Sequence, residues 1–179
     1  MTRLLQTTRL NMQAFAEAGV PLMETTPLQN LERLAQEVTR LQADSIVNWQ
    51  AAPELRAGST DQLDIWLHLT ADTSLPLTCQ RCMAAVQTPL RVDQWYRFVA
   101  SEEVAMAEDD ASDEDLLVLS PQFDLAEVLE DELLMALPLV PMHDICPELP
   151  GFSAGVPDAP ENVADKPNPF AALAQLKKK

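Results

Sequence analysis

The alternation of apolar and polar residues predicts several short strands in the middle of the chain. Within 63–70, aliphatic residues at the odd positions alternate with Asp64, Trp66, His68 and Thr70, and a period of two is typical of a half-buried strand. Further strands are expected at 75–78, 86–99 and 116–119. Because strands that follow one another closely are most economically joined as antiparallel neighbours, the pattern predicts an antiparallel sheet.

Apolar residues at helical spacing predict two amphipathic helices. The first runs over 27–41 and begins with Thr26-Pro27-Leu28-Gln29, a capping box with proline at the first helical position. The second runs over 124–137, with Asp124 as its N-cap and Pro138 as its end. Together the patterns predict an α+β fold, in which the two helices cover an antiparallel sheet.

Composition changes this description at two places along the chain. Residues 102–115 hold eight acidic residues and no basic one, which predicts a mobile surface loop because like charges repel. A proline-rich stretch follows the second helix, and the last residues carry a short apolar face too small to form a stable helix alone. We therefore expect a single domain with an N-terminal arm at 1–140 and an extension with a loosely ordered basic tail at 141–179.

The net charge of −16 is distributed unevenly. Residues 98–165 carry 18 of the 28 acidic residues and no Lys or Arg, whereas all four lysines lie in the last fourteen residues. This asymmetry predicts one surface for a basic partner and another for a polyanion such as RNA. The plainer interpretation is a solvated surface with a solvated tail.

Two sets of candidate contact residues follow from the charge pattern. The candidate RNA contacts are Lys166, Lys177, Lys178, Lys179, Arg91 and Arg97. The candidate partner contacts are Glu127, Glu130, Asp131 and Phe170.

Several functional classes lack their usual motifs. No glycine-rich phosphate loop, Ser-His-Asp arrangement or H-E-x-x-H motif is present, so no enzymatic activity and no small-molecule substrate are expected. The longest apolar run is interrupted by Pro138 and Pro141 and is too short to span a bilayer. Three cysteines without a secretory signal favour a cytoplasmic protein with reduced thiols.

Two short motifs with the same spacing form a candidate metal site. Cys79 and Cys82 stand three residues apart, as do His143 and Cys146, and three thiolates with one imidazole are an accepted set of ligands for structural zinc. The alternatives are unliganded thiols at a strand turn or a redox-active C-x-x-C. The redox role requires a helix after the first cysteine within a βαβ unit, whereas the residues after Cys82 resemble a strand.

The longer motifs resemble those of the large ribosomal RNA subunit accumulation protein family (YceD). They are Leu-Thr-Cys-Gln-Arg-Cys at 77–82, Asp-Leu-Ala-Glu-Val-Leu-Glu-Asp-Glu-Leu-Leu-Met-Ala-Leu-Pro-Leu-Val-Pro at 124–141, His143-Asp144, and Lys-Pro-Asn-Pro-Phe-Ala at 166–171. The resemblance implies a bacterial cytoplasmic protein that supports the synthesis, processing or stability of large-subunit (23S) ribosomal RNA. Many members of the family carry a fuller second cysteine cluster, where this chain has only His143 and Cys146.

Three functional hypotheses result. The leading one is a non-enzymatic ribosome-biogenesis adaptor, whose acidic surface holds a basic large-subunit ribosomal or processing protein and whose lysines contact ribosomal RNA. The second is a structural zinc-knuckle module that binds a partner, and the third is a thiol oxidoreductase.

Overall fold

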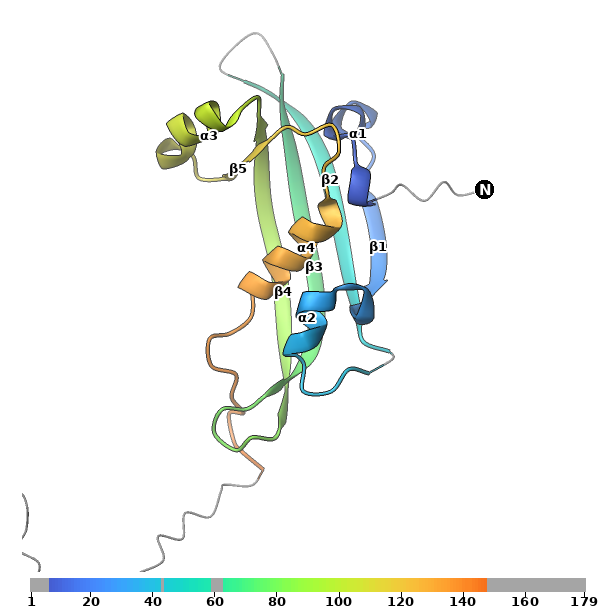
Figure 1. Ribbon diagram of the computed structural model, residues 1–179, viewed down its shortest axis with the longest axis vertical. Coiled ribbons are helices and arrows are strands. Elements are labelled where there is room, and N and C mark those ends of the chain that lie inside the picture. The colour runs from blue at the N-terminus through green and yellow to red at the C-terminus, as the bar shows by residue number, and fades with distance from the viewer. Residues whose placement is uncertain (1–6, 43, 59–62, 148–179) are drawn as a thin grey trace, which may run out of the picture. The chain divides into compact units, whose positions relative to one another are not determined.

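The computed structural model describes residues 7–42, 44–58 and 63–147 (Figure 1). They belong to one compact unit, Met1–Glu148, and form an α+β arrangement of one sheet with flanking helices. The second unit, Leu149–Lys179, lies outside the described residues, and so does the predicted basic tail. Within the described residues, no helix combines the length and the apolar character needed to cross a bilayer.

The sheet has five strands in sequence order: β1 (Leu22–Pro27), β2 (Ile46–Ala57), β3 (Leu63–Thr78), β4 (Ala85–Val99) and β5 (Asp115–Val118). The first four pair antiparallel, but β5 runs parallel to β4. The prediction of a purely antiparallel sheet is therefore wrong at β5. A parallel neighbour needs a crossover of about a dozen residues or more, and the segment between β4 and β5 supplies it.

That crossover is the acidic segment, and the prediction of a mobile loop there is wrong. It forms the helix α3 (Glu102–Glu108) and a 3₁₀ turn, η3 (Asp109–Ala111). Arg97 of β4 donates hydrogen bonds to Glu108 over 2.8 Å, to Glu114 over 2.7 Å and to Ser112 over 3.0 Å. One arginine from an adjacent strand thus reduces the repulsion that the composition suggested and holds the second half of the segment.

The predicted helix at 27–41 is much shorter in the structure. Pro27 ends β1, a 3₁₀ turn η2 (Leu28–Asn30) follows, and the helix α2 covers only Glu32–Glu37. Thr26 does not cap it, because its hydroxyl accepts a hydrogen bond from the Trp49 indole over 2.9 Å. The predicted capping box is therefore wrong.

The predicted helix at 124–137 is present as α4 (Leu125–Met135), and the Asp124 carboxylate caps it by accepting from the Glu127 amide over 2.9 Å. Strands β1 and β2 were not predicted. Two elements that precede them were not predicted either, a 3₁₀ turn η1 (Thr7–Arg9) and the helix α1 (Met12–Ala18). An antiparallel bridge between Leu10 and Phe123 joins this region to the chain just before α4.

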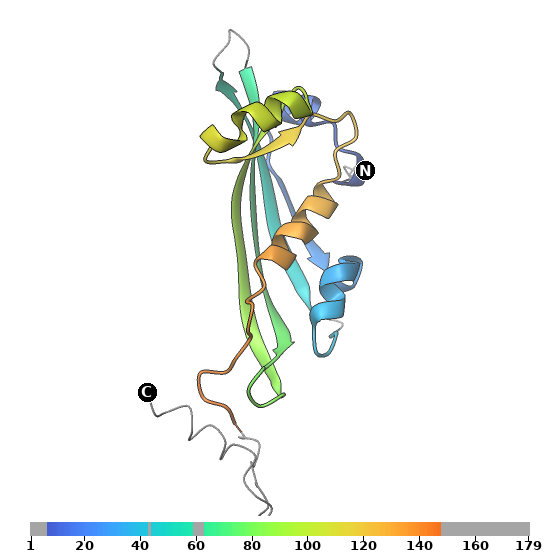
Figure 2. The same cartoon turned by 60° about the vertical axis from the view of Figure 1, so that its left-hand side comes forward.

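The hydrophobic core lies on one face of the sheet, the face on which α2 and α4 are found (Figure 2). Leu67, Leu69 and Leu75 of β3 are fully buried there, as are Leu125 and Leu133 of α4. Side chains at the alternate positions of β3 point to the opposite face and are mostly polar. One face is thus built for packing, and the charged and aromatic groups of the other face meet solvent.

Candidate metal centre and charged surfaces

The turn between β3 and β4 brings Cys79 and Cys82 together. The Cys79 amide donates to the Ala84 carbonyl over 2.9 Å, and the Met83 amide donates to the Cys79 carbonyl over 2.9 Å. Met83 has a φ of 62°, in the left-handed region, which lets the chain reverse within the turn. Cys79 is buried and Cys82 is half-buried, and neither is in a disulfide.

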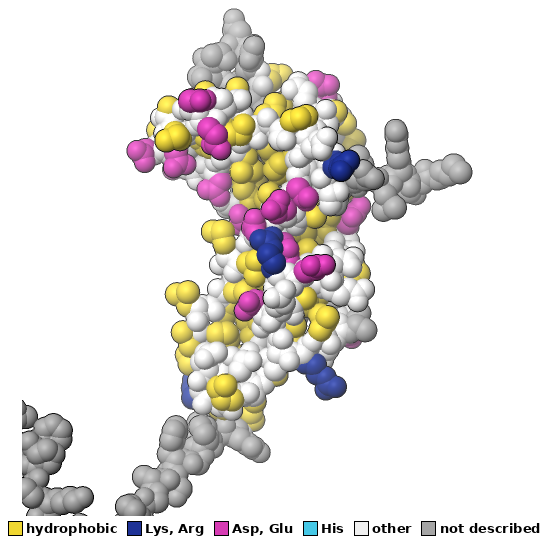
Figure 3. Space-filling model, viewed as in Figure 1, with side chains coloured by type: hydrophobic (Ala, Val, Ile, Leu, Met, Phe, Trp, Pro, Cys, Tyr) yellow, Lys and Arg dark blue, Asp and Glu magenta, His cyan; other side chains and the backbone are white. Residues whose placement is uncertain are grey.

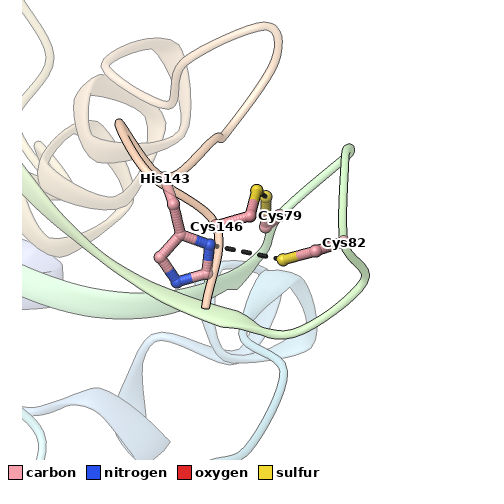
Figure 4. A group of neighbouring side chains, drawn as sticks. All are labelled: Cys79, Cys82, His143 and Cys146. Atoms are coloured by element: carbon pink, nitrogen blue, oxygen red, sulfur yellow. Dashed lines mark hydrogen bonds between the residues drawn. The ribbon is translucent and has the colours of Figure 1, made fainter. Parts of the chain in front are cut away.

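The other two candidate ligands come from the segment after α4, which we call the strap (residues 138–147). The Gln80 amide donates to the Pro141 carbonyl over 2.9 Å, and the Arg81 guanidinium donates to the His143 carbonyl over 3.2 Å. These bonds hold His143 and Cys146 beside the β3–β4 turn (Figure 4). The structure therefore unites the two motifs that the sequence separates by 60 residues.

The four ligand atoms have the spacing of a tetrahedral metal site. The Sγ atoms of Cys79 and Cys146 are 3.9 Å apart, and Cys82 Sγ is 3.5 Å from His143 Nδ1. All four ligand atoms lie within 4.8 Å of one another. Tetrahedral zinc with ordinary bond lengths would place two sulfurs about 3.8 Å apart and a sulfur and a nitrogen about 3.6 Å apart. The cluster could therefore hold a metal ion with little movement of its side chains.

The surroundings shift the pKa values of two thiols in opposite directions. Burial raises the pKa of the Cys79 thiol, but hydrogen bonds from the backbone of Cys82, His143 and Arg81 outweigh burial and lower this pKa to about 5. Burial and hydrogen bonds with the other two thiols raise the pKa of Cys146 to about 11. The backbone groups around Cys79 thus favour its thiolate, and thiolate is the form that binds metal.

The structure gives His143 a fixed orientation as well. Its Nε2 lies 3.1 Å from the Ala85 carbonyl oxygen, while Nδ1 faces the thiols. A carbonyl acceptor at Nε2 requires the proton there, which leaves the Nδ1 lone pair free for a metal.

Glu130 does not have the exposed position expected of a partner-binding residue. Its side chain is 12% exposed, and one carboxylate oxygen accepts from the amides of Arg33 and Leu34 over 2.7 and 3.1 Å. The other accepts from Arg33 Nε over 3.0 Å. The N-cap residue of α2 is Leu31, whose side chain cannot accept a hydrogen bond from the free amides of the first turn. Glu130 of α4 accepts from them instead, so it is a structural residue.

The neighbours of Glu130 on α4 are partly occupied too. Asp131 pairs with Arg33, and Glu132 accepts from the buried Tyr96 hydroxyl over 2.6 Å. Burial and this carboxylate raise the pKa of Tyr96, so its hydroxyl remains a donor. Of the predicted partner contacts on α4, Glu127 is the exposed one without such an ion pair among the described residues.

Of the candidate RNA contacts, the structure describes Arg91 and Arg97. Arg97 is only 15% exposed and is bound to Glu108 and Glu114, so little of its guanidinium is free for a phosphate, and its contact with RNA stays a prediction. Arg91 lies on β4 opposite Asp72 of β3. The other predicted RNA contacts lie outside the described residues, namely Lys166, Lys177, Lys178 and Lys179. The predicted partner contact Phe170 lies outside them as well.

A free acidic surface lies instead on the segment that was predicted as a loop. We call residues 102–115 the acidic lobe, and Figure 3 shows acidic side chains gathered over α3. Glu102, Asp109, Asp110 and Asp113 are exposed and form no ion pair within the described residues. Helix α3 buries none of its residues.

An aromatic stack on the open face of the sheet was not predicted. The Arg56 guanidinium carbon lies 4.3 Å from the Trp66 ring centroid and 4.1 Å from that of Trp95. His68 stacks on Trp95 at 4.1 Å and lies 2.6 Å from Asp93. The sequence did contain a sign of this stack, because both tryptophans alternate with inward-facing apolar residues and so lie on the solvent side of their strands. A tryptophan ring in that position is stabilised when a side chain from a paired strand packs on it.

Comparison with known proteins agrees with the resemblance noted in the sequence. The family model described as "Large ribosomal RNA subunit accumulation protein YceD" matches residues 67–177. A Haemophilus influenzae protein of the same name is 33% identical over 160 residues, which cover 83% of each chain. No solved structure matches. The β3–β4 turn, α4 and the strap all lie within the matched range, and the chain belongs to the YceD family of large ribosomal RNA subunit accumulation proteins.

Proposed function

We propose that this chain supports the accumulation of large-subunit (23S) ribosomal RNA in the bacterial cytoplasm as a non-catalytic adaptor. The family and the name of the Haemophilus influenzae relative support the process. In this proposal the acidic lobe binds a basic large-subunit ribosomal or processing protein, and the lysines near the C-terminus contact RNA.

The observation that carries the adaptor role is the unequal use of acidic residues. Carboxylates of α4 serve internal contacts with Arg33 and Tyr96. In the acidic lobe, four exposed carboxylates form no ion pair among the described residues, namely those of Glu102, Asp109, Asp110 and Asp113. Exposed Met106, with 81% of its surface accessible, adds an apolar group to the same lobe. A lysine- or arginine-rich segment complements such a surface electrostatically, and the attraction speeds its association.

RNA contact is assigned to the lysines alone. The described body has a strong excess of carboxylates and repels a polyanion, and Arg97 is committed to Glu108 and Glu114. Lys177, Lys178 and Lys179 give a compact positive charge, whose binding to phosphates will be sensitive to salt.

Pull-down with the purified full chain tests both contacts. We expect nuclease-treated lysate to yield large-subunit proteins with the natural chain, and much less with a variant that has Glu102, Asp109, Asp110 and Asp113 changed to amides. A control variant carries the same number of changes at exposed Glu17, Glu32, Glu37 and Asp44 and should behave as the natural chain. Recovery of neither large-subunit protein nor 23S rRNA would contradict the adaptor role.

A second proposal concerns the cysteine cluster. We infer that Cys79, Cys82, His143 and Cys146 hold a structural zinc ion. The supporting observation is the ligand spacing given above, together with four protein ligands, which is typical of structural rather than catalytic zinc. A thiol oxidoreductase is disfavoured, because the turn after Cys79 leads into β4, whereas a redox C-x-x-C of the thioredoxin kind begins the helix of a βαβ unit.

Metal analysis of protein purified without an affinity tag tests this site. One equivalent of zinc is expected in the natural chain and none in Cys79→Ser. The exposed, non-ligand change Asp144→Asn should keep the metal. Cobalt substitution should give the absorption bands of a tetrahedral thiolate site, and their absence would contradict the proposed ligand set.

A further inference from the structure

The strap is ordered in the structure although burial contributes little to holding it. Leu139 is fully exposed, Ile145 is 88% exposed, and Val140 and Met142 are about half exposed. No helix or strand includes any strap residue. Its large apolar side chains therefore do not anchor it to the core.

Helix α4, immediately before the strap, is held in a different way. Leu125, Leu129 and Leu133 are all at most 1% exposed, and they pack in the core on the sheet. Hydrophobic burial therefore holds the chain in place up to the end of α4, but the strap, which begins at Pro138, must be held by other interactions.

The attachments of the strap are concentrated at the cysteine cluster. Gln80 and Arg81 donate to strap carbonyls, and His143 contacts the Ala85 carbonyl. The remaining contacts are those of the ligand atoms themselves, at 3.9 and 3.5 Å. Three exposed or half-exposed hydrogen bonds do not offset the conformational entropy lost by ordering ten residues. A metal that cross-links two distant segments can offset it.

We propose that the metal ion is the clasp that holds the strap to the β3–β4 turn, so that the strap is ordered with metal and released without it. The sheet and α4 remain folded in both states, because the hydrophobic core that joins them is buried mainly by residues outside the cluster. This inference rests on the proposed zinc site.

The clasp has a consequence for the molecular surface. A groove of about 980 Å³ lies between the strap and the start of β4, and it is lined by Ala85, Val86 and Pro89 on one side and Val140, Met142 and Ile145 on the other. One wall is made entirely of strap residues, so metal removal abolishes the groove and the apolar surface beside it.

Amide relaxation by NMR on the full chain tests the clasp. In the zinc-loaded protein, we expect order parameters near 0.85 for amides in 139–146, close to those of α4, and values below about 0.6 after chelation. Added zinc should restore the high values. The α4 amides report whether the rest of the molecule stays folded.

Variants separate the clasp from the metal site. Cys146→Ser removes a strap ligand and should free the strap while α4 stays rigid, whereas Asp144→Asn changes a neighbouring strap residue and should leave the strap rigid.

If zinc is bound but strap order is unchanged by chelation, the clasp is wrong and the zinc site survives. If α4 and the sheet lose order together with the strap, the metal supports the whole fold and the local clasp is wrong. If the natural chain binds no zinc, both proposals fail.

Discussion

At the scale of single residues, several acidic and basic side chains that look like surface charges are structural. Glu130 is the clearest case, because its carboxylate accepts from two amides of another helix and from Arg33. Residues of this kind cannot be recognised from helical periodicity, since the carboxylate is on α4 and the amides it caps are about a hundred residues away in α2. The sequence did predict that the three cysteines and His143 form one group, because the equal spacing within each pair is visible in the sequence itself.

Glu130→Ala should destabilise the protein by about 2 kcal/mol, since it leaves two amides of α2 uncapped and removes a partner from Arg33. Urea unfolding followed by circular dichroism measures this difference. Glu127→Ala, on the exposed side of the same helix, is the matched control and should cost well under half as much. Equal effects of the two changes would show that Glu130 is not the cap of α2.

Arg56→Ala should remove the cation from between Trp66 and Trp95 and lower stability by about 1 kcal/mol. Tryptophan fluorescence should change at the same time, because two of the three tryptophans border the guanidinium. Arg40→Ala, which changes an exposed arginine without such a contact among the described residues, should alter neither property. An unchanged spectrum in Arg56→Ala would contradict the stack.

At the scale of elements, the sequence predicted those with a strong and continuous periodic signal. Strand β4 and helix α4 follow the apolar pattern closely, whereas the two strands predicted at 63–70 and 75–78 form a single strand, β3. Strand β2 was missed, although Val47, Trp49, Ala51 and Pro53 alternate inward, because alanine and proline are weak strand formers. Helix α3 could not be predicted, because its counter-charge, Arg97, lies on another element.

Arg97→Gln should disorder the acidic lobe. The change leaves Glu108 and Glu114 without the cation that joins them, so their repulsion is no longer offset and the lobe is expected to lose about 2 kcal/mol of local stability. Hydrogen exchange of amides in 102–115 measures the local effect, and the α4 amides should stay protected. Arg91→Gln, at an exposed position of the same strand, serves as control, and equal exchange in both variants would contradict the role of Arg97.

At the scale of the whole molecule, charge segregation is the property that links this fold to its proposed role. The sequence alone revealed it, but only the structure distinguishes carboxylates that face solvent on the acidic lobe from those used inside the protein. The position of the acidic surface therefore changes from α4 to α3, while the assignment of RNA contact to the lysines stays a prediction.

RNA binding by the full chain should weaken steeply with salt. If Lys166, Lys177, Lys178 and Lys179 contact phosphates of single-stranded RNA, the slope of log affinity against log salt should be about −3. Filter binding between 50 and 200 mM salt would then show a loss of roughly 50-fold. Changing the four lysines to glutamine should remove both the binding and the slope, whereas persistent salt-sensitive binding would place the contact elsewhere.

The most direct test of the adaptor proposal is the ratio of 23S to 16S rRNA in bacteria that lack their natural copy of this protein. The natural chain should restore the ratio, and so should the control with amides at Glu17, Glu32, Glu37 and Asp44. The variant with amides at Glu102, Asp109, Asp110 and Asp113 should be made at normal levels and fail to restore it. Full restoration by that variant would contradict the claim that the acidic lobe is the surface through which the protein binds its basic partner.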